Sequence, residues 1–207
     1  MKLNLPNKIT ISRIFIIPVF MLFAIPVPGW MLEAQFLAAI RPQLQAISDF
    51  LQNYGNYIAA VIFIIAASTD FVDGYIARKR NLVTNLGKFL DPIADKLLVT
   101  AALIILVQTN IISSWVAMII IAREFIVTGL RLVAAAEGTV LAAGNIGKLK
   151  TATQDIAIVA AFLGNYPLSL FTSFRFDQYI MFLAVIFTIY SAYDYIKKNI
   201  NVLSNSN

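Results

Sequence analysis

The sequence contains neither cysteine nor histidine in its 207 residues. Disulfides, zinc–thiolate sites and thiol nucleophiles are therefore excluded. Imidazole bases, phosphohistidine intermediates and histidine-ligated metals are excluded as well. Any acid–base or metal chemistry must use carboxylates, and ligands that are all oxygen favour hard ions such as Mg²⁺ or Mn²⁺.

Charged residues are also scarce. They make up 13% of the chain, against about 25% in a soluble domain, while 59% of the residues are hydrophobic. Apolar runs near 20 residues have the length that crosses a bilayer. We therefore predict an all-α integral membrane protein with six transmembrane helices in a single domain, residues 1–207. The predicted spans lie near residues 10–29, 56–79, 92–110, 112–136, 147–166 and 178–197.

Basic residues are distributed unevenly across these predicted spans. Of the 16 lysines and arginines, only Arg41 and Arg175 fall on the side opposite the two termini. Positively charged loops stay in the cytoplasm, which predicts that both termini face the cytosol. We attribute the net charge of +5 to contact with anionic membrane lipids and not to nucleic acid. Residues 30–54 are too polar to span, and their spacing favours an amphipathic segment at the outer interface.

Four aspartates interrupt this apolar pattern. Asp70 and Asp73 share one face near the end of the predicted helix 56–79, where the helix dipole and the membrane depth both disfavour carboxylates. Asp91 and Asp95 also share a face, and the Asp-Pro pair at Asp91 predicts that the third helix begins there. A short connection predicts antiparallel packing of the two helices, which would bring four carboxylates together as a binuclear divalent-metal site.

Small residues and one arginine accompany these acids. Gly74 and Gly87 lack side chains, and Ala77 is small, so a ligand can approach the two helices closely. Arg78 is placed to reach a phosphate there. Each residue also has a simpler interpretation on its own: the glycines as packing positions, Arg78 as an anchor in a cytosolic loop, and Asp70 or Asp73 as a satisfied core carboxylate.

The combined spacing, D-x2-D-G-x2-A-R-x8-G-x3-D-x3-D over residues 70–95, matches at every position the signature of the CDP-alcohol phosphotransferase family. Three further stretches resemble the bacterial phosphatidylglycerophosphate synthases, one branch of this family. They are LNLPNKITISR, AREFIVTGLRLVAA and AAGNIGKLKTATQ.

This resemblance implies six spans around a polar cavity that faces the cytosol of a bacterial plasma membrane, often in a homodimer. It implies that two Mg²⁺ or Mn²⁺ ions are bound by Asp70, Asp73 and Asp91, with Asp95 as general base and further metal ligand. The residues that would frame the CDP part of CDP-diacylglycerol are Asp70, Asp73, Gly74, Ala77, Arg78 and Gly87.

The reaction implied by the resemblance transfers the phosphatidyl group from CDP-diacylglycerol to the sn-1 hydroxyl of glycerol 3-phosphate, giving phosphatidylglycerophosphate and CMP. Within the family, inositol phosphate or phosphatidylglycerol are alternative acceptors.

Two other classes of protein also use intramembrane acids. A divalent-cation transporter would place acids along a through-pathway, and a polyprenyl-diphosphate transferase usually carries two aspartate motifs. Here the acids gather at one face in one motif.

A dianionic acceptor needs fixed cations. Arg123 interrupts an apolar span, where arginine tends to face a cavity, and Arg131 follows about two turns later. Lys148 and Lys150 open the fifth span. We predict that these four residues bind the acceptor phosphate. The alternatives are pairing of Arg123 with Glu124 or another buried acid, and interface anchoring by the two lysines.

The mouth of the first helix carries Asn7, Thr10 and Arg13 at intervals of three residues. We predict contact of Asn7 and Thr10 with the nucleotide or lipid headgroup, with helix capping and membrane anchoring as the alternatives.

Overall fold

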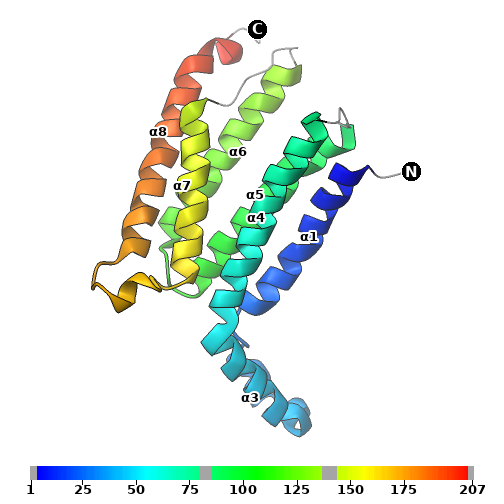
Figure 1. Ribbon diagram of the computed structural model, residues 1–207, viewed down its shortest axis with the longest axis vertical. Helices are drawn as coiled ribbons and strands as arrows, with labels where there is room; N and C mark the ends of the chain where they lie inside the picture. The colour runs from blue at the N-terminus through cyan, green and yellow to red at the C-terminus, as the bar shows by residue number, and fades with distance from the viewer. Residues whose placement is uncertain (1–3, 80–84, 137–143, 205–207) are drawn as a thin grey trace. The chain divides into compact units, whose positions relative to one another are not determined.

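The computed structural model describes residues 4–79, 85–136 and 144–204, and these residues form helices joined by turns (Figure 1). Within these ranges, side chains are described except for residues 5–6, 70–79, 85–86, 88–89, 136, 145 and 200–204. The long helices are α1 (Leu5–Ala24), α4 (Asn56–Lys79), α5 (Asn85–Gln108), α6 (Ser114–Ala136), α7 (Asn145–Phe162) and α8 (Phe176–Ser204).

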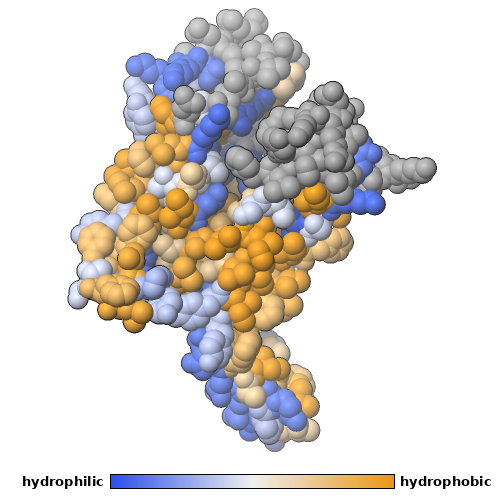
Figure 2. Space-filling view, in the orientation of Figure 1, coloured by the Kyte–Doolittle hydropathy of each residue, from blue (hydrophilic) through white to orange (hydrophobic). Residues whose placement is uncertain are grey.

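Each of the six segments predicted to span the membrane is found as one of these helices. Among the described residues, three stretches are long and apolar enough to cross a bilayer, judged by length and composition: Asn7–Ala24, Gln35–Thr69 and Phe176–Asn199. The all-α prediction is therefore confirmed, and the protein has the apolar helices of a membrane protein. On the face drawn in Figure 2, hydrophobic side chains cover much of the middle stretches of the helices.

The helices pack as two compact units, residues 1–109 (unit 1) and 110–207 (unit 2). In unit 1, α1 is the main packing partner of both α4 and α5, which also contact each other. Buried alanines such as Ala59, Ala60 and Ala102 let the backbones approach closely. Phe20 of α1 packs on Phe63 of α4 with ring centroids 6.2 Å apart. The first helix of the chain is thus the centre of unit 1.

The start of α5 corrects one prediction. The helix begins at Asn85, not at Asp91 and Pro92, so Pro92 lies inside it. A proline within a helix removes one backbone hydrogen bond, and α5 accommodates that loss. Asp91 and Asp95 therefore lie roughly two and three turns from the helix start. The helix dipole acts mainly on the first turn, so its expected stabilisation of these two carboxylates is small.

Residues 30–54 are helical, as their apolar spacing predicts. They form α2 (Gly29–Glu33), a 3₁₀ helix (Gln35–Ile40), α3 (Arg41–Phe50) and a short π-helix (Leu51–Gly55) that leads directly into α4. Figure 2 shows both hydrophilic and hydrophobic side chains along α3, as expected for an amphipathic segment. A Cβ atom built at Gly55 would overlap the carbonyl oxygen of Phe23. Glycine at this position therefore allows the π-helix to lie against the end of α1.

In unit 2, α8 packs against both α6 and α7. Apolar side chains such as Ile120, Ile158 and Ala184 are fully buried in it. α7 ends at a turn in which Gly164 has a φ of +58°, a conformation that glycine adopts without strain. Next to it, the Asn165 side chain donates a hydrogen bond to the carbonyl oxygen of Phe174 at 2.7 Å and closes the connection to α8. The last long helix of the chain is thus the centre of unit 2.

Candidate functional site

The predicted site residues divide between the two units. The aspartate site, defined here as Asp70, Asp73, Asp91 and Asp95, belongs to unit 1. Asp70 and Asp73 lie in the last three turns of α4, as do Gly74, Ala77 and Arg78, and the side chains of all five are outside the described residues. On α5, Gly87 is buried in the first turn, while Asp91 and Asp95 are half-buried.

Asp91 has a defined partner on α1. The hydroxyl of Thr10, which is 1% exposed, donates a hydrogen bond of 2.6 Å to Asp91 Oδ1. A hydroxyl carries no charge, so it orients the carboxylate and leaves its negative charge in place. Asp95 follows four residues later on the same helix face. The contact therefore fixes one carboxylate oxygen while the acidic character of this face is kept.

Arg13 is buried beside the other half of the motif. Its side chain is 1% exposed, and Nε donates to Thr69 Oγ1 at 3.4 Å. Thr69 immediately precedes Asp70 and donates its own proton to the carbonyl oxygen of Ala66 at 2.6 Å. A buried guanidinium at this point contributes positive potential beside the part of α4 that carries Asp70 and Asp73.

The mouth of α1 is therefore not an exposed anchor. Asn7, Thr10 and Arg13 are all buried, with exposures of 5%, 1% and 1%. The helix is preceded by Asn4, which makes no side-chain cap hydrogen bond. Such burial does not fit side chains that anchor a helix at the membrane surface. Helix capping by Asn7 stays an alternative interpretation. The contact of these residues with a nucleotide stays a prediction.

The donor chemistry of the aspartate site suits a hard divalent ion. Its described ligand atoms are carboxylate oxygens, one of them oriented by Thr10, and Mg²⁺ and Mn²⁺ prefer such ligands. Among the described side chains, no group of three or more acidic residues is gathered in one place. Because Asp70 and Asp73 lie outside that set, the convergence of four carboxylates stays a prediction.

Unit 2 contains a cluster of opposite composition. Arg123 Nη1 lies 3.2 Å from Glu124 Oε1, and the Lys150 ammonium forms an ion pair with the same oxygen. Arg123 is 9% exposed and Lys150 is fully buried. We call Arg123, Glu124 and Lys150 the cation cluster. It carries two positive charges and one negative charge, so its net charge favours an anion.

Two residues of α8 fix the arginines of α6. Ser191 Oγ lies 2.7 Å from Nη2 of Arg123, and this hydrogen bond is buried. One turn later, Tyr195 accepts a hydrogen bond from Nε of Arg131 at 3.2 Å. The Arg131 guanidinium also lies over the Tyr195 ring, 5.4 Å from its centroid, at a distance typical of cation–π contacts. α8 therefore positions both arginines.

The predicted acceptor residues are thus brought together only in part. Arg123 and Lys150 converge on Glu124, which is the pairing considered as an alternative for Arg123. Arg131 is held separately by Tyr195, and Lys148 is exposed. Neither Ser191 nor Tyr195 is among the residues expected from the sequence. Their signal is weak, because α8 carries several other hydroxyl side chains, such as Thr188, Tyr190 and Tyr193.

Three buried side-chain polar atoms among the described residues of unit 2 make no hydrogen bond. They are Oδ1 of Asn165, Nε of Arg123 and Oε1 of Gln154, and Gln154 lies one turn beyond Lys150 on α7. Leaving a buried donor or acceptor without a partner costs about 1–3 kcal/mol. A water molecule or a bound ligand that pairs with the atom removes this cost.

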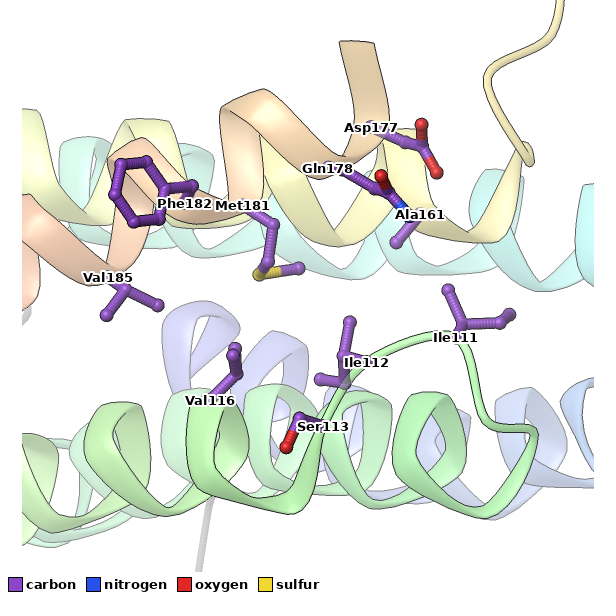
Figure 3. Close-up of a pocket in the computed structure, with 10 residues that line it drawn as sticks. All are labelled: Ile111, Ile112, Ser113, Val116, Ala161, Asp177, Gln178, Met181, Phe182 and Val185. Atoms are coloured by element: carbon purple, nitrogen blue, oxygen red, sulfur yellow. The ribbon is translucent and has the colours of Figure 1, made fainter. Parts of the chain in front are cut away.

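A cavity of about 230 Å³ lies at the other end of α8. Figure 3 shows Met181 of α8 pointing across it toward Ile112 and Val116. Its acidic residue, Asp177, forms an ion pair with Arg175 at 2.9 Å. This hydrogen-bonded pair raises the pKa of the Arg175 guanidinium. An apolar lining with an engaged carboxylate does not suit a phosphate, so the cation cluster is the better candidate for an anionic substrate.

The fold and these residues define the class first: an all-helical membrane protein with acidic and basic side chains buried among its helices. The chain belongs to the CDP-alcohol phosphatidyltransferase family, whose sequence model matches residues 3–190.

Individual relatives carry a more specific name. The CDP-diacylglycerol–glycerol-3-phosphate 3-phosphatidyltransferase of Bacillus subtilis (strain 168) is 49% identical over 204 residues, covering 99% of both chains. The protein of that name from Rickettsia typhi is 36% identical, covering 94% of this chain and 96% of its own. That from Haemophilus influenzae is 30% identical, covering 95% and 94%.

Proposed function

We propose that this protein transfers the phosphatidyl group of CDP-diacylglycerol to glycerol 3-phosphate, releasing phosphatidylglycerophosphate and CMP. The names of relatives that cover nearly the whole chain support this reaction, as does the intact aspartate motif. The observation that carries the choice of acceptor is the convergence of Arg123 and Lys150 on one buried point. A small dianion requires such a pair of fixed cations.

The aspartate site holds the donor. When bound there, Mg²⁺ or Mn²⁺ ions, two in our proposal, offset the negative charge of the pyrophosphate and of the departing CMP. Thr10 keeps Asp91 oriented for this task. The residues proposed as metal ligands are Asp70, Asp73, Asp91 and Asp95, and those proposed to frame the nucleotide are Asp70, Asp73, Gly74, Ala77, Arg78 and Gly87, with Asn7 and Thr10 beside them.

Asp95 acts as general base in this proposal. Its carboxylate accepts the proton of the sn-1 hydroxyl of glycerol 3-phosphate. The resulting oxygen attacks the phosphorus that bears diacylglycerol, and the bond from that phosphorus to the CMP oxygen breaks. The acceptor phosphate is held by Arg123 and Lys150, with Arg131 and Lys148 contributing positive charge at longer range.

The membrane arrangement is part of the same proposal. All six long helices cross a bacterial plasma membrane, and both termini face the cytosol. CDP-diacylglycerol enters the cytosol-facing site from the inner leaflet, and glycerol 3-phosphate enters it from the cytosol. The excess of basic residues on one side of the spans supports this orientation. The active form is proposed to be a homodimer, as the family resemblance implies.

An acceptor screen tests the function. Purified protein in detergent with Mg²⁺ or Mn²⁺ is given CDP-diacylglycerol, and CMP release is measured with glycerol 3-phosphate, inositol phosphate, phosphatidylglycerol or no acceptor. We expect CMP release with glycerol 3-phosphate and its loss when EDTA removes the metal. Turnover with inositol phosphate or phosphatidylglycerol but not with glycerol 3-phosphate would show that the acceptor is wrongly assigned. Metal-independent turnover would contradict the role of the aspartates.

A further inference from the structure

The contacts of Glu124 distinguish it from Asp194, another acidic residue of unit 2. One of its carboxylate oxygens, Oε1, is shared by the Arg123 guanidinium and the Lys150 ammonium. These two cations come from different helices, α6 and α7, and both are buried. By contrast, the Asp194 carboxylate accepts from Lys198 at 2.8 Å within one helix, and that lysine is 66% exposed.

The shared oxygen has an electrostatic consequence. Two cations that contact one atom lie close to each other, and like charges at this range repel strongly in a poorly hydrated interior. Removing a charge partner from buried cations is costly because it leaves uncompensated charge. Glu124 is therefore what permits Arg123 and Lys150 to point at the same place.

The geometry around Arg123 adds a second constraint. Ser191 holds Nη2 from the side of α8, while Glu124 takes Nη1. The guanidinium is planar, so two contacts at different nitrogens fix its orientation. Nε stays buried without a partner. Arg123 is thus already oriented before any acceptor is bound.

We propose that Glu124 is a positioning residue for the acceptor: it holds Arg123 and Lys150 convergent, so that together they bind the phosphate of glycerol 3-phosphate. This inference rests on the proposed function. Glu124 does not itself bind substrate in this scheme. The three residues of the cluster sum to one positive charge, and the Asp155 carboxylate on α7 also attracts Lys150. The convergence of the two cations therefore matters more for phosphate binding than the net charge, because preorganised cations lose less freedom on binding.

Glu124→Gln and Glu124→Asp test this role. Glutamine keeps the shape and an acceptor oxygen but removes the charge, whereas aspartate keeps the charge and shortens the side chain. The matched control is Asp194→Asn, which removes a carboxylate from an exposed lysine pair of the same unit. For each protein we measure kcat and KM for both substrates, and the shift in melting temperature produced by glycerol 3-phosphate without donor.

The expected result is a rise of about tenfold or more in KM for glycerol 3-phosphate in Glu124→Gln, the loss expected when a charged hydrogen-bonding arrangement is disrupted. The KM for CDP-diacylglycerol stays within about twofold, because in this proposal the donor binds at the aspartate site and not at the cation cluster. Glu124→Asp recovers part of the loss, and Asp194→Asn resembles the unmodified protein. Stabilisation by glycerol 3-phosphate weakens in the same order.

Three outcomes overturn the proposal. An unchanged KM for glycerol 3-phosphate in Glu124→Gln removes Glu124 from acceptor binding. A lowered KM shows that its carboxylate competes with the phosphate. An equal loss for both substrates, with a lower melting temperature and no rescue by aspartate, shows a purely structural role. If the unmodified protein releases CMP only with another acceptor, the proposed function fails instead. The melting-temperature shifts with glycerol 3-phosphate then decide the role of Glu124 separately.

Discussion

Unit 1 and unit 2 both bury polar side chains among apolar helices, but they compensate charge differently. In unit 1, the described partner of Asp91 is the neutral hydroxyl of Thr10, which leaves the negative charge uncompensated by that contact. In unit 2, Arg123 and Lys150 are paired with a carboxylate of their own unit. The aspartate site of unit 1 is thus suited to an external cation, whereas the cation cluster of unit 2 is already partly neutralised by Glu124.

This difference indicates how the two units divide the work. A site that requires a metal to compensate its carboxylates responds steeply to the loss of one acid. A preorganised pair of cations responds mainly through the affinity for one substrate. Substitutions in unit 1 should therefore change kcat and metal use, whereas those in unit 2 should change the KM for the acceptor.

The largest effect is expected from Asp95→Asn in unit 1. Loss of the general base should lower kcat by about 10³-fold, within the range of 10²–10⁴ for such groups, while CDP-diacylglycerol still binds. Turnover measured by CMP release, together with equilibrium donor binding, checks both parts. Asp49→Asn, at an exposed position on α3, is the matched control. Loss of donor binding equal to that of Asp73→Asn would argue that Asp95 is a metal ligand only.

Arg123→Ala should have the next largest effect. It removes the contacts to Glu124 and Ser191 and one cation of the proposed acceptor site. A charged hydrogen bond contributes about 1.5–3 kcal/mol, so KM for glycerol 3-phosphate should rise about 30-fold, since about 1.4 kcal/mol corresponds to a factor of ten. The initial rate as a function of acceptor concentration gives this value. Lys198→Ala serves as control for a lysine in an exposed pair. An unchanged acceptor dependence would exclude Arg123 from the site.

Thr10→Val tests whether the neutral partner in unit 1 matters. Valine has nearly the same shape but cannot donate to Asp91, and one hydrogen bond contributes about 1 kcal/mol. The Mg²⁺ concentration for half-maximal rate should therefore rise about fivefold. Thr188→Val is the control, because that hydroxyl donates to the Ala184 carbonyl of its own helix. Equal metal dependence in both variants would show that Thr10 does not orient a metal ligand.

The smallest effect is expected from Tyr195→Phe in unit 2. The substitution removes the hydrogen bond from Arg131 but keeps the ring beneath its guanidinium. The hydrogen bond joins the buried Tyr195 to the exposed side chain of Arg131. Such a bond contributes about 0.5 kcal/mol, so the KM for the acceptor should rise about twofold. Tyr195→Leu removes the ring as well and should give a larger rise. If both variants match the unmodified protein, Arg131 does not contribute to acceptor binding.

Much of the helical framework could be predicted from the sequence. The helix predicted at residues 56–79 has those bounds in the structure. Its apolar run has the length of a spanning helix, and the acidic pair Asp70 and Asp73 continues the helical spacing toward Lys79. The start of α5 was predicted wrongly because Asp91-Pro92 resembles a helix start. That local signal is overridden, because residues 85–91 continue the helix through Pro92.

The candidate site was predictable in composition but not in pairing. The spacing of the aspartates and the position of Arg123 identified residues of interest, since charge within an apolar helix is uncommon. The contact between Thr10 and Asp91 joins residues 81 positions apart, and Ser191 lies 68 positions from Arg123. Such pairs depend on how the helices rotate about their axes, which periodicity in a single sequence does not specify.

The central helices of the two units also differ in when the ribosome makes them. α1 is translated before the helices α4 and α5 that pack on it, so each of them finds its main partner already made. α8 follows α6 and α7 in the chain, so Arg123, Glu124 and Lys150 are all translated before Ser191. Glu124, the next residue in the sequence, is therefore available to Arg123 before its partner on α8 has been made.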